Sequence, residues 1–539
     1  MMQSYVMNKW NFLVVVFAIT IFNLQSRAQV SPEISWREIE TEHFYVIFDA
    51  KQKELGERYA RAAEDVYATL KLYFAKLPPK TALVVNDSTD DANGFATPFP
   101  RPMIQVFPVL PGPNDTISYY KSWEYSLLIH EYTHIIQTTL AEGVFRPLRS
   151  IFGSFVVPNA IAPRWILEGM AVSVESSFDE FGRLNSPYYH ALIRSMVEDG
   201  TWGNENISQI NETSTPTWPF GQRPYFFGAL VTNEIQEQVG FDAFDKLLLK
   251  NARRVPGFVG AVPVALFNKS YQEYLADAYS RWEKVAKFEI KKIQSSTSKP
   301  FKTITEEERI SVHSIDISPN GLRLAYVQKR LHEDNELLVY ERKVTSESFF
   351  ANKPKTIVTR EGIDHIAWID NDAILMTAKR THKRYFDFND IYRVDVKKKK
   401  SKGLTKGARL SGAIPGKHKR FYAVQNVGGG TQLVEISQDG KTITPIYTPA
   451  LGVRLSRPAL ISKSELAFNE KATDGVDRIR LMDLNSKSIR AFPGIPDNSR
   501  SPKRTKAGLI FVSESSGVAN IYLYNFAERK SYPISNVQS

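Results

Sequence analysis

SWEYSLLIHEYTHIIQTTLAEG, residues 122–143, predicts a single helix. Ser122 suits the N-cap, Gly143 suits the position after the last turn, and no proline interrupts the segment. Apolar residues fall on most sides, which predicts a buried helix. His130 and His134, in the segment HEYTH, are four residues apart and therefore project from the same face.

This spacing lets both imidazoles bind one zinc ion. Glu131 lies beside that face, where a carboxylate can take a proton from a water molecule that the metal activates. An HExxH segment also arises by chance, most often in a charged surface helix. Here the helix is apolar and a second acidic motif follows, which favours the zinc interpretation.

A catalytic zinc ion needs a third protein ligand, and Glu168 is the candidate. It lies in WILEGMA, residues 165–171, 34 residues after His134. Pro163 suits the first turn of a helix that we expect to reach about Ser176. An acidic residue on an otherwise apolar helix is costly unless it is paired or binds a metal. The alternative is a surface or salt-bridged glutamate.

HEYTH followed by WILEGMA resembles the peptidase MA-like branch of the gluzincins, relatives of thermolysin and the aminopeptidase N-type enzymes, over roughly residues 36–290. The interval between the two motifs is longer than in the best-known gluzincins. The resemblance implies an α+β zincin-type peptidase domain that holds Zn²⁺ through His130, His134 and Glu168. It implies that Glu131 is the catalytic base.

The same resemblance implies two further parts of a site. A strand at the sheet edge, here within residues 94–103, would pair with an extended substrate, although an ordinary loop and edge strand is an equal alternative. Tyr225 heads the segment PYFFGALVTNEI and is the candidate donor to the oxyanion. His190 is a weaker rival for that role.

Other patterns predict the elements around the motifs. We expect strands over 36–49, 80–85 and 102–109 and helices over 51–77, 187–200 and 222–239, with amphipathic helices over 241–290. Residues 145–157, FRPLRSIFGSFVV, are unusually apolar for a connector. They could form a lid, a loop that touches a membrane or a short buried helix, and burial is the expected outcome.

The start of the chain predicts export. Lys9, an apolar run over 10–24 and the small residues Ser26 and Ala28 predict a secretory signal peptide over residues 1–28. An uncleaved membrane anchor is less favoured because the run is short for a span. No later stretch is apolar enough to cross a bilayer, so we expect no transmembrane helix in the mature chain. The chain has no Cys, which favours a bacterial periplasm or cell surface.

Charge divides the chain into two parts. Residues 29–299 contain 27 Lys and Arg and 32 Asp and Glu, whereas residues 300–539 contain 40 and 26. The basic half could face an acidic cell-envelope partner, or could be a solvated surface without a partner. Nucleic acid is not expected as a partner, because the chain is exported and has no recognition motif.

Residues 300–539 predict an all-β domain, because short β runs recur about every 40–50 residues. ISPNGLRLAYV and NIYLYN resemble TolB-type propeller repeats, and we count five blades. Either strands from elsewhere close the ring or the chain is part of a longer protein. A β-sandwich is the alternative fold. There is no Gly-x-Ser-x-Gly segment for a serine hydrolase, and residues 428–430 predict a turn.

The sequence therefore predicts a signal peptide (1–28), a gluzincin-like zinc peptidase domain (29–299) and a TolB-like propeller (300–539). The predicted function is hydrolysis of peptide bonds in a peptide or protein substrate, with the propeller binding the substrate or a partner. The alternatives are a cell-envelope binding or scaffold protein with a vestigial zincin domain, and a domain that uses the metal only for stability.

Overall fold

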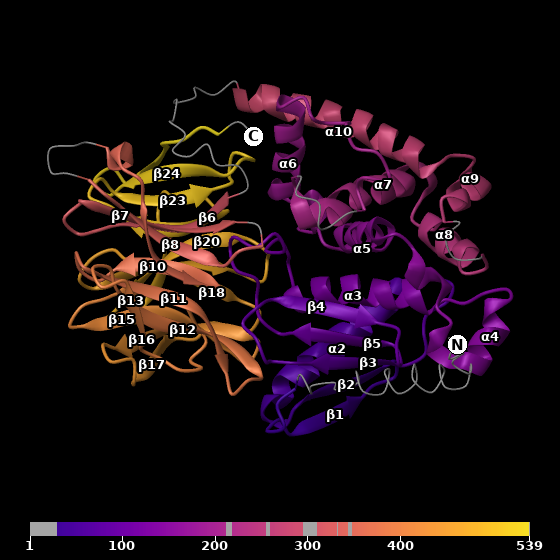
Figure 1. The fold of residues 1–539 in the computed structure, drawn as a ribbon, viewed down its shortest axis with the longest axis horizontal. Coiled ribbons are helices and arrows are strands. Elements are labelled where there is room, and N and C mark those ends of the chain that lie inside the picture. Colours follow the sequence, from indigo (N-terminus) through magenta and orange to yellow (C-terminus); the bar gives the residue numbers. More distant parts are fainter. Residues whose placement is uncertain are drawn as a thin grey trace, which may run out of the picture.

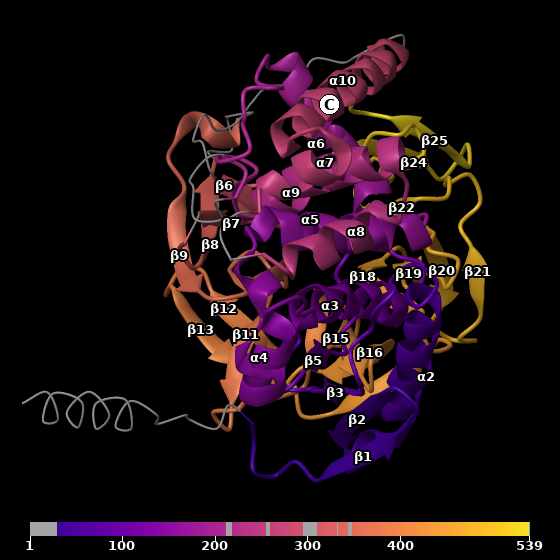
Figure 2. The same cartoon turned by 90° about the vertical axis from the view of Figure 1, so that its right-hand side faces the viewer.

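The computed structural model describes residues 30–211, 218–254, 259–294, 310–330, 332–342 and 348–537. They form two lobes side by side, an α/β domain and a β-propeller (Figures 1 and 2). The expected signal peptide and the expected boundary at residues 299 and 300 lie outside the described residues. Within the described ranges, no helix is long and apolar enough to span a bilayer.

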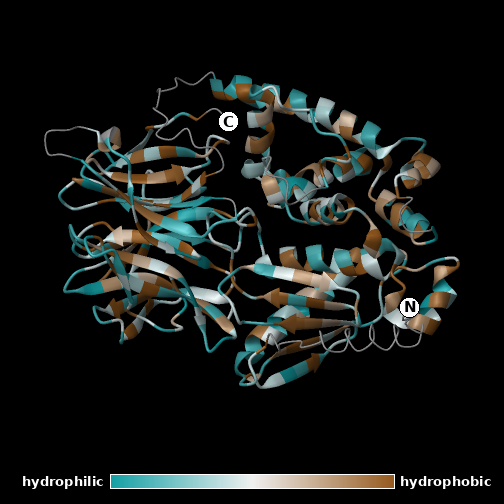
Figure 3. Cartoon of the chain, viewed as in Figure 1, coloured by the Kyte–Doolittle hydropathy of each residue, from teal (hydrophilic) through white to brown (hydrophobic). Residues whose placement is uncertain are grey.

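A five-stranded mixed sheet underlies the α/β domain, in the order β1-β2-β3-β5-β4. β2, β3 and β5 are parallel, and the outer strands β1 and β4 run antiparallel to their neighbours. The central strands are mostly hydrophobic (Figure 3). The strand bounds are β1 (Trp36–Glu40), β2 (Phe44–Asp49), β3 (Thr81–Val85), β4 (Asn93–Thr97) and β5 (Met103–Phe107).

Two predicted elements in this region have different bounds. The strand expected over 36–49 is a hairpin, because the Thr41 hydroxyl accepts a hydrogen bond from the Phe44 N–H and reverses the chain. The helix expected over 51–77 is preceded by the 3-10 helix η1 (Ala50–Gln52) and is α2 (Lys53–Leu70). It ends early in a turn that buries Phe74 in the core.

The motif helix is α3 (Trp123–Thr139), and it is buried as expected. It begins after Ser122 but ends four residues before Gly143. After Thr139 the chain is extended, and the N–H of Glu142 donates to the carbonyl of Ala252 in another segment. This tertiary hydrogen bond replaces the last turn of the predicted helix.

Helices cover the other side of the motif helix (Figure 1). α5 (Arg164–Phe178) crosses α7 (Arg223–Val239) so closely that a methyl group at Gly169 would lie 2.2 Å from the carbonyl carbon of Gly228. This contact is possible only because neither residue has a side chain. The other elements are α4 (Phe145–Phe152), η2 (Gly153–Phe155), η3 (Pro158–Ile161), η4 (Arg183–Asn185), α6 (Pro187–Glu198), η5 (Phe220–Gln222), α8 (Ala243–Asn251), α9 (Ala261–Phe267) and α10 (Tyr271–Gln294).

The prediction that residues 145–157 are buried is wrong. None of the residues of α4 is buried, and Ile151 is 73% exposed. α4 lies at the end of the α/β domain away from the propeller, where no described element covers its outer face (Figure 1).

The second lobe is a propeller of five four-stranded antiparallel blades, which confirms the predicted number of blades and excludes a β-sandwich. Four hydrophobic cores each lie between successive blades. The first and last blades are joined by Lys503, whose ammonium group lies 2.6 Å from Asp316. The turn predicted over 428–430 joins β15 to β16. The blades are β6 (Ile310–Ile317), β7 (Arg323–Arg330), β8 (Asn335–Glu341) and β9 (Lys355–Arg360), the last two linked by η6 (Phe349–Ala351); β10 (Ile363–Trp368), β11 (Ala373–His382), β12 (Phe386–Asp395) and β13 (Lys400–Gly403); β14 (Leu410–Pro415), β15 (Arg420–Val427), β16 (Gly430–Ser437) and β17 (Ile443–Tyr447); β18 (Arg454–Leu460), β19 (Glu465–Lys471), β20 (Asp477–Asp483) and β21 (Ile489–Ala491); and β22 (Ser499–Arg504), β23 (Leu509–Ser513), β24 (Asn520–Asn525) and β25 (Lys530–Pro533).

Buried polar contacts join the two lobes. The guanidinium group of Arg409, in the propeller, lies 2.6 Å from Asp87 and 2.8 Å from Asp90, both in the loop between β3 and β4. Arg454 donates to the carbonyl of Pro111. Removing one member of a buried ion pair leaves the other charge without compensation. The lobes are therefore held in one relative position.

Candidate metal centre

Three side chains from two helices converge in the cleft between α3 and α5. The Nε2 atoms of His130 and His134 are 3.2 Å apart. An Oε2 atom of Glu168 lies 3.5 Å from the first and 3.2 Å from the second. Of the described residues, these three form the group of His and carboxylate ligands that could hold a metal ion.

These distances fit a tetrahedral zinc ion. Nitrogen and oxygen ligands about 2.0–2.1 Å from such an ion lie roughly 3.3–3.4 Å from one another. The set of two imidazoles and one carboxylate is also that of zinc sites with a fourth position open to water. Burial alone would raise the pKa of Glu168. Hydrogen bonds with the two histidines nevertheless hold this pKa well below its usual range, so the carboxylate is anionic.

Both histidines are oriented by a second hydrogen bond. Nδ1 of His130 lies 2.9 Å from Oε2 of Glu175, and Nδ1 of His134 lies 2.8 Å from the amide oxygen of Gln137. Such partners fix the tautomer that leaves Nε2 free for a metal. Although Glu175 is buried, Arg183 donates to both its oxygens and lowers its pKa to about 2.

Glu131 lies between the ligands and the edge strand of the sheet. A methyl group at Gly94, in β4, would approach its Oε1 atom to 3.2 Å. Burial raises the pKa of Glu131 above its ordinary value. The predicted edge strand is therefore present as β4 (93–97), although Met103, at the end of the predicted range, belongs to β5.

Tyr225 lies on the opposite side of the ligands, in the first turn of α7. Its ring is stacked at 6.5 Å from the His130 ring, and its hydroxyl accepts a hydrogen bond from Arg164 at 3.1 Å. Burial raises the pKa of Tyr225, so the hydroxyl keeps its proton and can donate it in a hydrogen bond. His190 is elsewhere: its Nδ1 atom is 2.7 Å from Glu289, which also accepts from Arg194.

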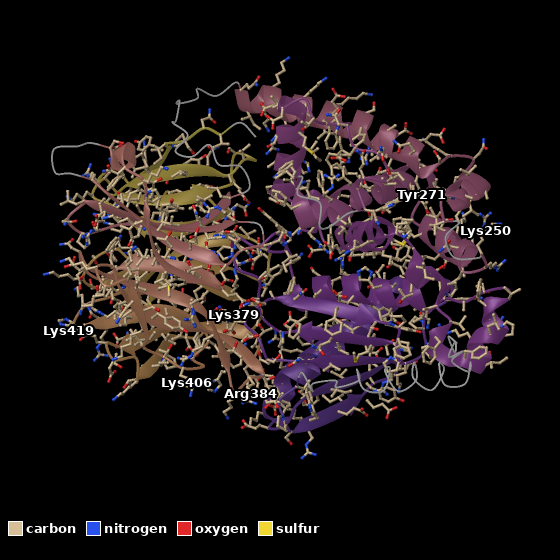
Figure 4. The ribbon with its side chains drawn as sticks, in the orientation of Figure 1. Lys250, Tyr271, Lys379, Arg384, Lys406 and Lys419 are labelled. Carbon is tan, nitrogen blue, oxygen red and sulfur yellow. The ribbon has the colours of Figure 1, made fainter. Side chains whose placement is uncertain are left out.

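A cavity of about 1050 Å³ connects these residues to the propeller. One wall contains the ligands, Glu131, Tyr225 and β4, and the opposite wall contains inner residues of the propeller such as Asp364, Arg454 and Arg457. Lys379 lies on the propeller side of this boundary (Figure 4) and forms an ion pair with Asp91. The candidate site thus faces the propeller rather than open solvent.

Sequence reasoning missed the supporting residues Gln137, Glu175 and Arg183. Gln137 is one turn after His134 and could have been found from helical spacing. Glu175 is two turns after Glu168 on the same helix, at i+7, and could have been found in the same way. Arg183 begins η4, after a turn, and no sequence pattern places it beside Glu175.

No protein-family model and no curated protein sequence matches the chain. Several solved structures are similar to the chain. The chain is similar to TolB from Acinetobacter baumannii, at 15% identity and a TM-score of 0.35, over 43% of this chain and 56% of that one. It is similar to a puromycin-hydrolyzing peptidase of Mycobacterium tuberculosis, at 13% identity and a TM-score of 0.28, over 38% of this chain and 34% of that one. It is also similar to an oligogalacturonate lyase of Vibrio parahaemolyticus, at 12% identity and a TM-score of 0.29, over 42% of this chain and 80% of that one.

Proposed function

We propose that the chain is a zinc-dependent metallopeptidase. The observation that carries the proposal is the tetrahedral spacing of the ligand atoms of His130, His134 and Glu168, with the carboxylate of Glu131 beside them. The sequence of residues 1–28 supports export as part of the same proposal.

Each residue has a distinct part in hydrolysis. Zn²⁺, when bound, supplies the Lewis acidity that makes water nucleophilic and polarises a carbonyl. Glu131 takes the proton of the attacking water and delivers it to the leaving amine. Tyr225 donates a hydrogen bond to the oxygen on which negative charge develops.

The edge strand β4 supports a peptide as the substrate. It pairs with β5 on one side only, and it passes directly over Glu131. An extended peptide can add to such an edge through main-chain hydrogen bonds, which are independent of sequence. This addition would place a peptide carbonyl beside the three metal ligands.

The cavity limits the size of that substrate. Pockets of roughly 300–1,000 Å³ accommodate drug-sized molecules. A cavity of about 1050 Å³ walled by the propeller admits a peptide segment of a few residues and excludes a folded domain. The substrate class that we propose is therefore a short or unfolded peptide.

Arg409→Ala is expected to relax this limit. It removes the cationic partner of Asp87 and Asp90 at the lobe interface, which costs about 3–5 kcal/mol when such a pair is buried, although Asp90 still accepts hydrogen bonds from Asn389 and Asn426. Cleavage of a bulky, partly folded protein should rise relative to cleavage of a short quenched peptide. The matched control is Arg393→Ala, whose ion pair with Asp370 is exposed. An equal ratio of protein cleavage to peptide cleavage in the wild type and both variants would contradict the size limit.

Tyr225→Phe is expected to lower kcat by about 10²–10³-fold, the range for the loss of one oxyanion donor. KM and zinc content should change little, because the ring keeps its contact with His130. Steady-state kinetics on one quenched peptide separates these quantities. An unchanged kcat would remove Tyr225 from the mechanism.

Removal of the metal with a chelator tests whether the chain is a metallopeptidase. Incubation with a peptide library should yield cleavage products, a chelator should stop their formation, and added zinc should restore it. Cleavage that survives complete metal removal would reject a metallopeptidase. Zinc binding without cleavage of any library member would favour the alternative of a binding protein with a vestigial site.

A further inference from the structure

The connector between the two motif helices exposes an apolar stripe. Its members are spaced as one face of a helix and its continuation, and all are at least 39% exposed: Val144, Leu148, Ile151, Phe152 and Phe155. Helical residues at i, i+4, i+7 and i+8, the spacing from Val144 to Phe152, normally face a protein core. Here the same pattern faces outward.

Phe99 extends the stripe through a ring contact, and Ile161 is a further exposed apolar residue of the same connector. Phe99, in the loop between β4 and β5, is 47% exposed, and its ring lies 4.7 Å from that of Phe155. Ile161, at the end of η3, is 65% exposed. We call these seven residues the α4 patch. Hydrophobic residues are visible along α4 at the edge of the α/β domain (Figure 3).

The surroundings of the α4 patch are basic. Residues 144–161 contain Arg146 and Arg149 and no acidic residue. Arg253, just after α8, lies next to the segment, since a methyl group at Gly143 would be 3.7 Å from its Cβ, and its guanidinium group lies 4.0 Å from the buried Glu142. Lys250, near the end of α8, lies at the same end of the domain (Figure 4). Arg146 and Lys250 form no ion pair within the described part of the chain.

We infer that the α4 patch docks on an anionic lipid surface. A helix with exposed aliphatic and aromatic residues on one face and arginines at its margin is suited to the boundary between headgroups and acyl chains. A two-fold contact with a second copy fits less well, because it would bring the basic residues around Arg146 close to their own copies. Anionic headgroups compensate these charges instead.

The α4 patch is continuous along the chain with two elements of the site. Phe99 is two residues after β4, and Ile161 is three residues before α5, which carries Glu168. The patch therefore joins the edge strand and the helix of the third ligand. The docking itself does not depend on the proposed activity.

The absence of Cys makes a direct test possible in the full chain. Phe155→Cys carries an environment-sensitive fluorophore, and Phe288→Cys, at a 70% exposed position on α10, is the matched control. On adding vesicles of phosphatidylcholine mixed with phosphatidylglycerol, the fluorophore at 155 should brighten several-fold and shift to the blue. Lipids that carry a quencher in their acyl chains should quench it, and the fluorophore at 288 should not respond.

Charge dependence is the second readout. Arg146→Gln should weaken the partition of the 155-labelled chain by roughly fivefold, the effect of one basic residue near an anionic surface. Vesicles of phosphatidylcholine alone should bind more weakly. An equal response at 155 and 288, or no response at 155, would overturn the inference. A response at 155 that rises with protein concentration in the absence of vesicles would assign the patch to self-association instead.

Discussion

Glu131→Gln should leave the metal in place and lower kcat by about 10²–10⁴-fold, the contribution of a positioned general base. Glutamine has the shape of glutamate, so the packing below Gly94 is kept. It cannot accept a proton from water at neutral pH. The three ligands are other residues, so the zinc content of the purified variant should equal that of the wild type.

Two measurements check this prediction on the same preparation, metal analysis and kcat on a quenched peptide. Glu237→Gln, an exposed glutamate on α7, is the control and should have wild-type activity. Loss of zinc from Glu131→Gln would show that the residue supports the metal rather than the proton transfer. Wild-type turnover would remove Glu131 from the mechanism.

Gly228→Ala is expected to destabilise the α/β domain strongly. Its Cβ would lie 2.2 Å from the carbonyl oxygen of Trp165, and no flexible side chain can move aside because the contact is with backbone. α5 and α7 would have to separate, at a cost of about 3 kcal/mol, the upper end of the usual range for overpacking. α5 carries Glu168 and α7 carries Tyr225, so zinc affinity should fall as well.

Thermal unfolding with and without zinc measures both effects. The control is Gly260→Ala, where a methyl group would meet no atom within 4 Å. A lower melting temperature for Gly228→Ala beside an unchanged one for Gly260→Ala is the expected result. Wild-type stability of Gly228→Ala would mean that the two helices can pack at a greater distance without loss.

The elements near the site could be predicted largely from local patterns. Helical spacing and apolar content place His130, Glu131 and His134 on a buried helix, and the cost of an unpaired acid singles out Glu168. The structure brings these residues together as expected. Recurring β runs separated by polar turns also give the five blades, since each blade is a local meander.

Other features depend on contacts between distant segments. α3 ends at Thr139 because Glu142 bonds to Ala252, more than a hundred residues away, and local residues could not reveal this. The Arg409 ion pairs that fix the lobes also join distant residues. The connector 145–157 was expected to be buried because apolar segments usually are. Its exposure depends on which elements cover it, and an apolar stripe looks the same in sequence whether it faces a core or a membrane.

The most direct measurement is the zinc content of the wild type beside Glu168→Ala, together with cleavage of a peptide library by both. We predict one zinc ion per wild-type chain, much less in Glu168→Ala, and cleavage by the wild type alone. Equal zinc content in the two proteins would contradict the assignment of Glu168 as the third ligand. A wild-type chain that binds no zinc would contradict the metallopeptidase altogether.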